Sequence, residues 1–186
     1  MNAQSSFLFL RSVRIMCLDA WPYRDDMTGT TDAGAWREHH LAVIAEENEL
    51  DFPSFGYGDA WALGTAMVAA ASARTLPVAL AINFGEQRVF HAALAGAAAT
   101  NDDWLARKFR AVAKHNCSSW ALACAQRAGQ SDYFSAGGYL RSEIALAGGA
   151  VPLRVQGSLI GAVGVSGLAE EDDHRFVIDA LRTFRS

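Results

Sequence analysis

The sequence predicts a single α+β domain in which an antiparallel sheet of about five strands is flanked by helices. Two hairpins carry this prediction, because in each of them two short apolar runs are joined by a tight turn of polar residues and glycine. The first joins Leu76–Ile82 to Arg88–Leu94, and the second joins Val151–Val155 to Leu159–Val165. Strands paired in hairpins run antiparallel, so a parallel sheet built from strand–helix–strand units is not expected.

The composition excludes several classes of protein. The 186 residues suit one domain, and 51% of them are hydrophobic against 19% charged, which argues against disorder. The formal net charge of -4 lacks the basic excess of a nucleic-acid-binding protein. No apolar run approaches the roughly 18 residues of a membrane span. We therefore expect neither a nucleic-acid partner nor a membrane partner.

Cysteine usage and small residues add two further expectations. The 3 cysteines have no short paired spacing, which argues against a disulfide framework and favours a cytoplasmic location. Alanine and glycine are abundant, and small side chains bury little apolar area each, at roughly 25 cal/mol per Å². A domain built in this way gains by burying more surface against copies of itself, so we expect a homo-oligomer.

The first two helices are predicted from apolar periodicity and from a capping residue. A helix covers Trp36–Glu49 and is followed by a short extended segment, Leu50–Phe55. Asp59 is a candidate N-cap for a second helix, Ala60–Arg74. This helix is apolar on nearly every side, so we expect it to be buried between the sheet and another surface.

The rest of the chain alternates between helical segments and the strands already described. Asn101 or Asp102 is the candidate N-cap of a helix that ends near Asn116, and Ser118 is the candidate N-cap of the next helix. The remaining segments are Ser131–Ala147, which has no clear pattern, and a final helix over Glu170–Phe184.

Residues 1–35 differ from the rest of the chain. Their apolar patch, Phe7–Leu10, is much shorter than the core of a signal peptide, and the polar stretch that follows it has no period. We predict a loose, poorly ordered N-terminal leader before a domain that covers residues 36–186. Met27 is an alternative start for the natural chain, which leaves the status of residues 1–26 open.

Three candidate ligand-binding residues lie on one side of the third helix. At about 100° per residue, Trp104, Lys108 and His115 fall within a narrow arc that is otherwise largely apolar. A lysine on such a face needs a partner, and ionisable groups in such places are candidates for a functional site. The alternative is structural, with Lys108 reaching a carboxylate and His115 ending the helix near its dipole.

Further candidates lie near the final helix and on the second strand. Ser166, Gly167 and His174 stand at or just before the start of the helix, and His91 lies on the strand. His174 is alternatively a capping or packing residue, and His91 alternatively points to solvent. No metal-binding motif occurs, although a pair formed by His91 and His174 is left open. The glycines before this helix lack the dinucleotide-binding spacing, and Ser166 does not lie in the G-x-S-x-G pattern of a nucleophile elbow.

A series of short motifs follows these residues along the chain in a fixed order. The motifs are Glu46–Pro53, Asp59–Gly64, Leu76–Val78, Val89–Leu94, Asn101–Lys108, Ser118–Ser119, Gly148–Leu153, Gly161–Leu168 and Asp173–His174. In this order and at this spacing they resemble uncharacterised protein family 0303, a branch of the haem-degrading-domain superfamily. That superfamily includes the GlcG-like proteins and the C-terminal domain of PduO-type cobalamin adenosyltransferases. The resemblance covers about residues 36–184.

The resemblance carries expectations about fold and ligand. It implies a profilin-like α/β domain with a five-stranded antiparallel sheet that assembles into dimers or larger rings. It also implies a connection with tetrapyrroles, which makes haem the candidate cofactor. The iron ligand would then be His91, His115 or His174, or a lysine.

Together these observations lead to one expected function and two alternatives. We expect an oligomeric, cytoplasmic domain that binds a small ligand whose identity the sequence leaves open. The expected ligand-binding residues are Trp104, Lys108, His115, Ser166, Gly167 and His174, with His91 as the cofactor-binding residue. The alternatives are a haem-degrading enzyme with a His-ligated haem, and a non-enzymatic oligomeric interaction scaffold.

Overall fold

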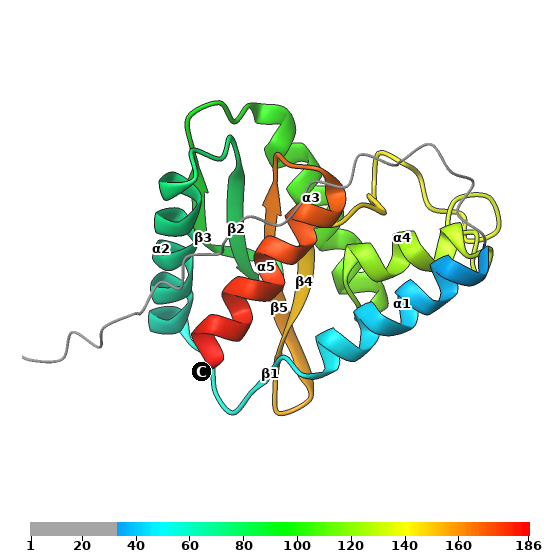
Figure 1. Ribbon diagram of the computed structural model, residues 1–186, viewed down its shortest axis with the longest axis horizontal. Helices are drawn as coiled ribbons and strands as arrows, with labels where there is room; N and C mark the ends of the chain where they lie inside the picture. Colours follow the sequence, from blue (N-terminus) through cyan, green and yellow to red (C-terminus); the bar gives the residue numbers. More distant parts are fainter. Residues whose placement is uncertain (1–32) are drawn as a thin grey trace, which may run out of the picture.

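The structure is a computed structural model that describes residues 33–186 (Figure 1). The predicted leader and Met27 lie outside the described residues, except that Ala33–Ala35 form the first turn of α1. In chain order the elements are α1 (Ala33–Asn48), β1 (Asp51–Phe52), α2 (Tyr57–Ala73), β2 (Ala79–Phe84), β3 (Gln87–Ala93), α3 (Ala99–His115), α4 (Ser119–Arg127), β4 (Ala150–Val155), β5 (Ser158–Ser166) and α5 (Glu170–Arg185).

The strands form one five-stranded sheet in the order β1-β4-β5-β2-β3. Both predicted hairpins are confirmed, because β2 pairs antiparallel with β3 and β4 pairs antiparallel with β5. β5 also pairs antiparallel with β2, with Leu80 opposite Val165, and this pairing joins the two hairpins. The predicted α+β domain with helices around a five-stranded sheet is therefore present.

The prediction of a purely antiparallel sheet is wrong at one edge. β1 runs parallel to β4, with Asp51 opposite Arg154 and Phe52 opposite Val155. The amide N–H of Gln156 extends this pairing by donating to the carbonyl of Phe52 at 3.0 Å. The chain reaches this edge from α1 rather than through a hairpin, so the position of α1 sets the direction of β1. A strand of 2 residues has no period, which explains why its direction was not predicted.

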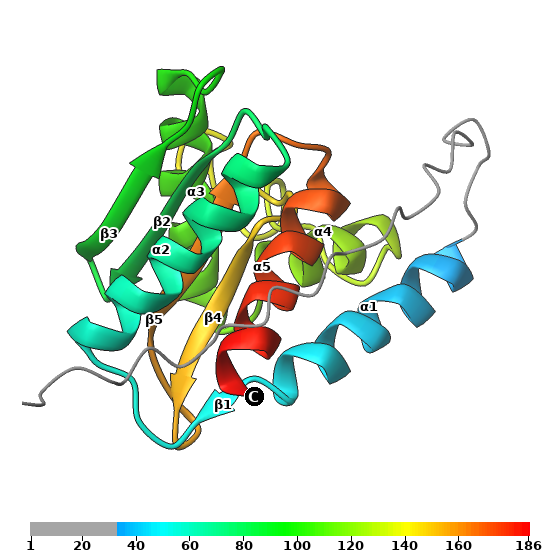
Figure 2. The same cartoon turned by 60° about the vertical axis from the view of Figure 1, so that its left-hand side comes forward.

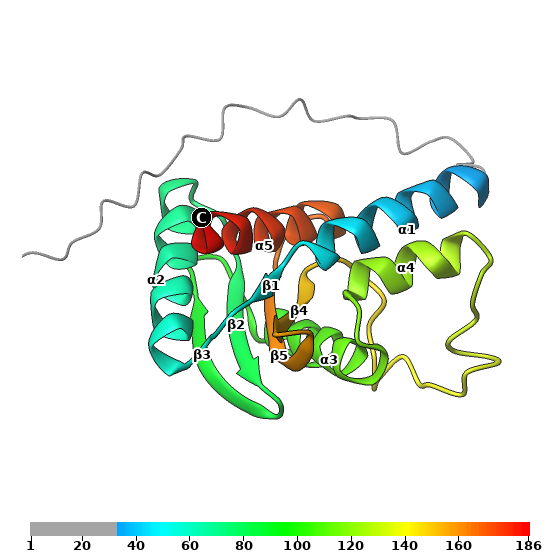
Figure 3. The same ribbon diagram turned by 90° about the horizontal axis from the view of Figure 1, so that it is seen from below.

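Helices cover both faces of the sheet (Figures 2 and 3). α2 and α5 lie on one face, α3 lies on the other, and α1 packs against α4. Successive side chains of β2 point to opposite faces of the sheet, as in any β-strand. Leu80 and Ile82 belong to the core under α2 and α5, whereas Ala79 and Ala81 pack against α3.

Small residues allow the helices to approach the sheet closely. A Cβ atom on Gly64 of α2 would come within 2.5 Å of the ring of Phe90. A Cβ atom on Gly164 of β5 would come within 2.6 Å of the ring of Phe109 on α3. Part of the glycine and alanine content is thus used for close packing inside one subunit.

The helix starts confirm one predicted cap and correct two others. Ser118 caps α4, because its hydroxyl accepts the backbone N–H of Ala121 at 3.0 Å. Asp59 and Asn101 are not N-caps, since α2 and α3 begin earlier than predicted and these residues occupy the third helical position. Each accepts the N–H of the residue before its helix, at 2.8 Å, which is the reciprocal half of a capping box.

The expectation that the second helix is buried between the sheet and another surface is confirmed only on the side of the sheet. α2 buries Leu63 and Met67 against the sheet. On its outer side Tyr57 and Trp61 are 65% and 66% exposed, because α2 is the outermost layer on that face. The apolar outer face of α2 therefore remains open in the part of the chain that the structure describes.

The segment without a predicted pattern, between α4 and β4, is irregular and is tied to α3 by arginines. Arg110 Nε donates to the carbonyl of Glu143 at 2.6 Å, and Arg107 donates to the carbonyl of Arg141 at 3.2 Å. Among residues 33–186, no helix is both long enough and apolar enough to cross a bilayer.

Candidate functional site

Four of the seven predicted site residues come together where β5 ends and α5 begins. Lys108 reaches this point from α3, Ser166 ends the strand, Gly167 follows it, and His174 lies in the first turns of α5. The other three predicted residues lie elsewhere and are described after this cluster.

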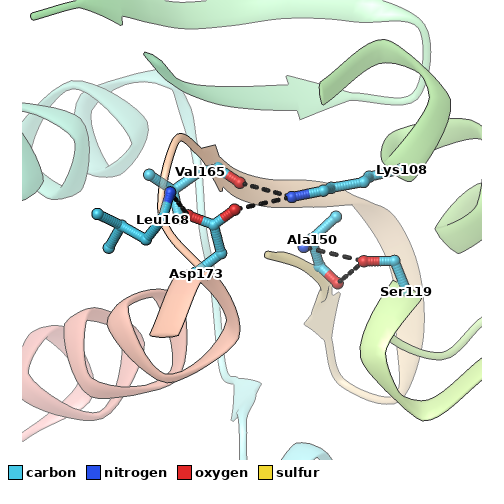
Figure 4. A network of polar contacts seen from close by, with 6 residues as sticks. All are labelled: Lys108, Ser119, Ala150, Val165, Leu168 and Asp173. Atoms are coloured by element: carbon cyan, nitrogen blue, oxygen red, sulfur yellow. Dashed lines mark hydrogen bonds and ion pairs between the residues drawn. The ribbon is translucent and has the colours of Figure 1, made fainter. Parts of the chain in front are cut away.

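Lys108 forms a buried ion pair with Asp173 (Figure 4). Its Nζ atom lies 3.0 Å from Asp173 Oδ2 and 3.3 Å from the carbonyl oxygen of Val165. The other carboxylate oxygen of Asp173 accepts the backbone N–H of Leu168 at 3.0 Å. Both charged side chains are only 3% exposed. The pair therefore links α3 to α5 past the end of the sheet.

The electrostatics of this pair are dominated by burial. Burial lowers the pKa of Lys108 and raises the pKa of Asp173, because each charged form loses its hydration. The attraction between the two groups opposes both of these shifts. Lys108 thus reaches a carboxylate, as the structural alternative expects. The carboxylate belongs to α5 and not to α3, the helix that carries Lys108.

A glycine makes room for the lysine ammonium. Gly149 has φ of +113°, and a Cβ atom there would lie 2.8 Å from Lys108 Nζ and 2.5 Å from the carbonyl oxygen of Val165. On the neighbouring strand end, the hydroxyl of Ser119 lies 3.1 Å from the N–H of Ala150, which donates to it (Figure 4). The Ser119 contact joins the start of β4 to α4.

Ser166 and Gly167 form the turn into α5. Ser166 is buried and stands opposite Ala79 at the end of the sheet. Gly167 has φ of +150°, and a Cβ atom there would lie 2.4 Å from the carbonyl oxygen of Pro77. This conformation and this close approach require glycine.

His174 is buried but has no hydrogen-bond partner in the described residues. It is 4% exposed, and neither Nδ1 nor Nε2 is hydrogen-bonded. Burial, with a smaller contribution from nearby cations, lowers the pKa of His174 to about 3, so the ring is neutral at physiological pH. His174 is one of the residues that line a cavity of about 140 Å³ between α1, α4 and α5.

His91 lies on the edge strand β3, on the face that carries α3. Its Nε2 atom is 2.6 Å from Oδ1 of Asp102, in the first turns of α3. Arg88 lies near the same carboxylate oxygen, with Nη1 4.0 Å from Oδ1. The His91 side chain is 35% exposed, so this contact is at the surface. His91 and His174 have separate surroundings, and no cluster of three metal-ligating side chains occurs among residues 33–186.

Trp104 and His115 do not share the buried face of α3 with Lys108. The buried residues of this helix lie between Leu105 and Val112, so its two ends are less covered. Trp104 is 38% exposed, and the guanidinium of Arg107 lies 4.0 Å from its ring centroid. His115 packs edge-on against two tyrosines, and burial lowers its pKa.

Comparison with known proteins places the chain in a family. Residues 55–182 match the family described as "Haem degrading protein HbpS-like". The chain belongs to the HbpS-like family. A "UPF0303 protein" of Streptomyces avermitilis is 40% identical over 141 residues, which cover 75% of this chain and 86% of that protein. A "UPF0303 protein" of Burkholderia vietnamiensis is 41% identical over 145 residues, covering 77% and 88%. The family expected from the motifs is therefore confirmed.

Solved structures share the fold of this HbpS-like chain. The Ybr137w protein has a TM-score of 0.72 at 26% identity, covering 78% of this chain and 87% of that one. The structure described as a "PduOC:Heme Complex" has a TM-score of 0.61 at 20% identity, covering 70% and 94%. HbpS itself has a TM-score of 0.56 at 21% identity, covering 71% and 90%. The last two likenesses concern the fold alone.

Sequence reasoning missed several partners in this HbpS-like domain. Asp173 lies in the acidic first turn of α5, which the helix dipole favours without any specific contact. Asp102 was considered only as a capping residue. Neither contact leaves a local signal, because Lys108 and Asp173 are 65 positions apart and His91 and Asp102 are 11 apart.

Proposed function

We propose that this HbpS-like protein is a cytoplasmic homo-oligomer that binds a tetrapyrrole, with haem as the first candidate, and that His91 ligates the haem iron. The observation that carries this proposal is the 2.6 Å contact between His91 Nε2 and Asp102 Oδ1 at an exposed sheet edge.

A histidine held in this way is suited to bind a metal. Metal-ligating histidines commonly donate their second ring N–H to a carboxylate, which fixes the ring and raises its basicity. With Nε2 donating to Asp102, the Nδ1 atom of His91 is the free acceptor, and it has no hydrogen-bond partner among the described residues. When bound, haem supplies an iron whose axial position an imidazole nitrogen fills. The guanidinium of Arg88, beside Asp102, is suited to pair with a propionate.

The other described histidines are less suited to ligate haem. His40 donates from Nδ1 to the carbonyl of Ala121 at 2.9 Å, and His39 accepts the indole N–H of Trp120 at 3.1 Å. His174 lines a cavity of about 140 Å³, smaller than the ~300–1,000 Å³ of typical ligand pockets, and its ring nitrogens are buried. His115 is enclosed by Tyr133 and Tyr139.

The oligomeric part of the proposal rests on the outer face of α2 and the adjoining edge of β3. Asp59 is the only charged residue of α2, and Trp61 on its outer face packs edge-on against Phe90 of β3 at 5.7 Å between ring centroids. β3 is an edge strand without proline or lysine, and Arg88 near its start is its only Lys, Arg, Asp or Glu residue. An uncharged apolar face does not repel a copy of itself, so a second copy of this chain is the partner that we propose.

The proposal is also supported by what the family and one fold neighbour are described as doing. The family description refers to haem degradation, and the PduOC domain was solved as a complex with haem. For this chain, binding of haem is the shared element of those descriptions, and the His91–Asp102 arrangement provides a residue to carry it.

A haemin titration of the full chain tests this function. Haemin is added to the purified protein while the Soret band is followed, and we expect saturable binding that weakens by about tenfold or more in His91→Ala. His115→Ala is the matched control, since it also removes a partly enclosed imidazole but lies at the far end of α3. Equal affinity in the wild type and in His91→Ala would overturn the assignment of His91.

The same preparation separates the alternative functions. Loss of the Soret band with ascorbate, faster than with an unrelated haem-binding protein, would indicate a haem-degrading enzyme. Absence of specific binding at micromolar haemin would contradict the proposal and leave the interaction scaffold. No step of haem degradation is assigned to particular residues.

A further inference from the structure

A larger cavity lies between the end of α4 and the irregular segment that follows it (yellow in Figure 1). Its volume is about 450 Å³, within the ~300–1,000 Å³ of typical ligand pockets. Its lining consists of one arginine, one aspartate and one phenylalanine, together with glycine, serine and glutamine residues. Because this lining contains no aliphatic side chain, a polar ligand suits the cavity better than an apolar one.

The cationic residue of the lining is Arg141. Its guanidinium has no hydrogen-bond or ion-pair partner among residues 33–186. Its Cζ atom lies 4.2 Å from the centroid of the Phe134 ring, which also lines the cavity. A guanidinium stacked in this way keeps the N–H groups at its edge available. Such a planar fork binds a carboxylate through two parallel hydrogen bonds.

The backbone that carries Arg141 is held by α3. Arg107 donates to the carbonyl of Arg141 at 3.2 Å, and Arg110 donates to the carbonyl of Glu143 at 2.6 Å. Neither Arg107 nor Arg110 lines the cavity. Because the backbone is held in this way, Arg141 is positioned before a ligand arrives, which reduces the conformational entropy lost on binding.

The anionic residue of the lining is Asp132. Its Oδ1 atom accepts the N–H of Ser135 at 2.9 Å, and this hydrogen bond lowers the pKa of the carboxyl group, so Asp132 is ionised at neutral pH. A carboxylate has about four acceptor sites, so Asp132 can still accept a hydrogen bond from a ligand. Asp132 and Arg141 form no ion pair with each other in the described chain. The cavity therefore carries two opposite charges that do not neutralise each other by contact.

We propose that this cavity binds a small zwitterion of the size of a dipeptide, with its carboxylate on Arg141 and its ammonium group on Asp132. The two charges of the lining match the two ends of such a molecule, and the serine and glutamine side chains match the amide between them. The size follows from the volume, because an engineered cavity of roughly 150 Å³ in another protein holds benzene, and this cavity is about three times larger. A ligand with only one charge would leave the opposite residue of the lining without a partner.

This site is separate from the haem site that we propose. None of its lining residues is among the seven predicted site residues, and neither His91 nor Asp102 lines it. The inference therefore does not depend on haem binding.

Alanylglutamine is a suitable probe, because it has both charged ends and an uncharged polar side chain. The full ¹⁵N-labelled chain is titrated with it while the backbone amide signal of Ser135 and the Nε–H signal of Arg141 are followed by NMR. We expect saturable shifts of both signals. N-acetyl-alanylglutamine lacks the ammonium group and alanylglutamine amide lacks the carboxylate, and each should bind about tenfold more weakly. Absence of saturable shifts with alanylglutamine, or equal affinity for all three compounds, would overturn the proposal.

Two variants assign the two ends of the probe. In Arg141→Gln, the preference for the free carboxylate over the amide should disappear, whereas the preference for the free ammonium group should remain. In Asp132→Asn the reverse is expected, and the asparagine oxygen can still accept the N–H of Ser135. Arg185→Gln and Glu86→Gln remove exposed charges outside the cavity and should keep both preferences. Both preferences unchanged in folded Arg141→Gln and Asp132→Asn proteins would contradict the proposed site.

Discussion

The Nζ atom of Lys108 lies 3.0 Å from Oδ2 of Asp173, and this contact joins a helix on one face of the sheet to a helix on the other. An ion pair so deeply buried loses hydration on both sides, so its net contribution to stability is small, although the loss of one partner alone is costly. Removing first the lysine alone and then both charges should therefore have different effects on the free energy of unfolding.

Lys108→Met should lower the free energy of unfolding by about 3–5 kcal/mol, because it leaves the Asp173 carboxylate buried without a cation. Adding Asp173→Asn to Lys108→Met should recover part of this loss, since the amide carries no charge and still accepts the N–H of Leu168. Urea unfolding followed by circular dichroism measures both changes. Lys114→Met, an exposed lysine of the same helix, should stay within about 0.5 kcal/mol of the wild type. A cost below about 1 kcal/mol for Lys108→Met would contradict the role of this ion pair.

The folded protein should become less stable as the pH is lowered, because His174 is buried in its neutral form. The pKa of this ring is about 3 in the folded chain, compared with an ordinary value of 6.5. Between these values the unfolded chain binds a proton that the folded chain does not, so stability is lost as the pH falls from about 6.5 toward 3. Between pH 7 and pH 5 the contribution of this one residue should be about 2 kcal/mol. Urea unfolding at the two pH values measures it, and the same pH dependence in His174→Phe would show that another group is responsible.

The close approach at Gly149 makes a further prediction. Gly149→Ala should destabilise the protein by about 2 kcal/mol or more, because the new methyl group meets Lys108 Nζ and a backbone oxygen at a positive φ angle. Gly157→Ala is the control, since its φ is +77° but nothing lies within 4 Å of the added Cβ atom. Its cost should be close to the conformational strain alone, about 1 kcal/mol. Equal losses of thermal stability in the two variants would argue against the crowding described at Gly149.

A single negative charge on the outer face of α2 should disrupt the proposed homo-oligomer. Trp61→Glu should convert a homo-oligomer into monomers, because it places a carboxylate on an uncharged face that we propose meets a second copy. Light scattering coupled to gel filtration gives the mass directly. Leu41→Glu alters another exposed apolar residue, on α1, and should leave the mass unchanged. A wild-type protein with the mass of a monomer would contradict the proposed homo-oligomer.

Much of the fold was predictable because its signals are local. The hairpins at Gly85 and Gly157, the cap at Ser118 and the apolar period of α5 each depend on a few neighbouring residues. The parallel direction of β1 was not predictable, because 2 residues contain no pattern and the direction depends on where α1 packs.

The candidate site was predictable in residue type but not in its pairing. Lys108 was recognised as a polar residue on an apolar face, and His91 as a histidine on a strand, but the carboxylates that hold them come from other elements. The cavity at His174 is formed by three helices, and only the folded chain brings them together. Spacing along a chain cannot show such contacts.

Chemical rescue of the haem ligand tests the role of His91 most directly. In His91→Gly, we expect haemin binding to weaken by about tenfold or more, and we expect added imidazole to restore the affinity and the Soret band of the wild type. His115→Gly should bind haemin normally and should not respond to imidazole. Wild-type haemin affinity in His91→Gly, or a loss that imidazole does not restore in a folded protein, would contradict the claim that His91 ligates the iron.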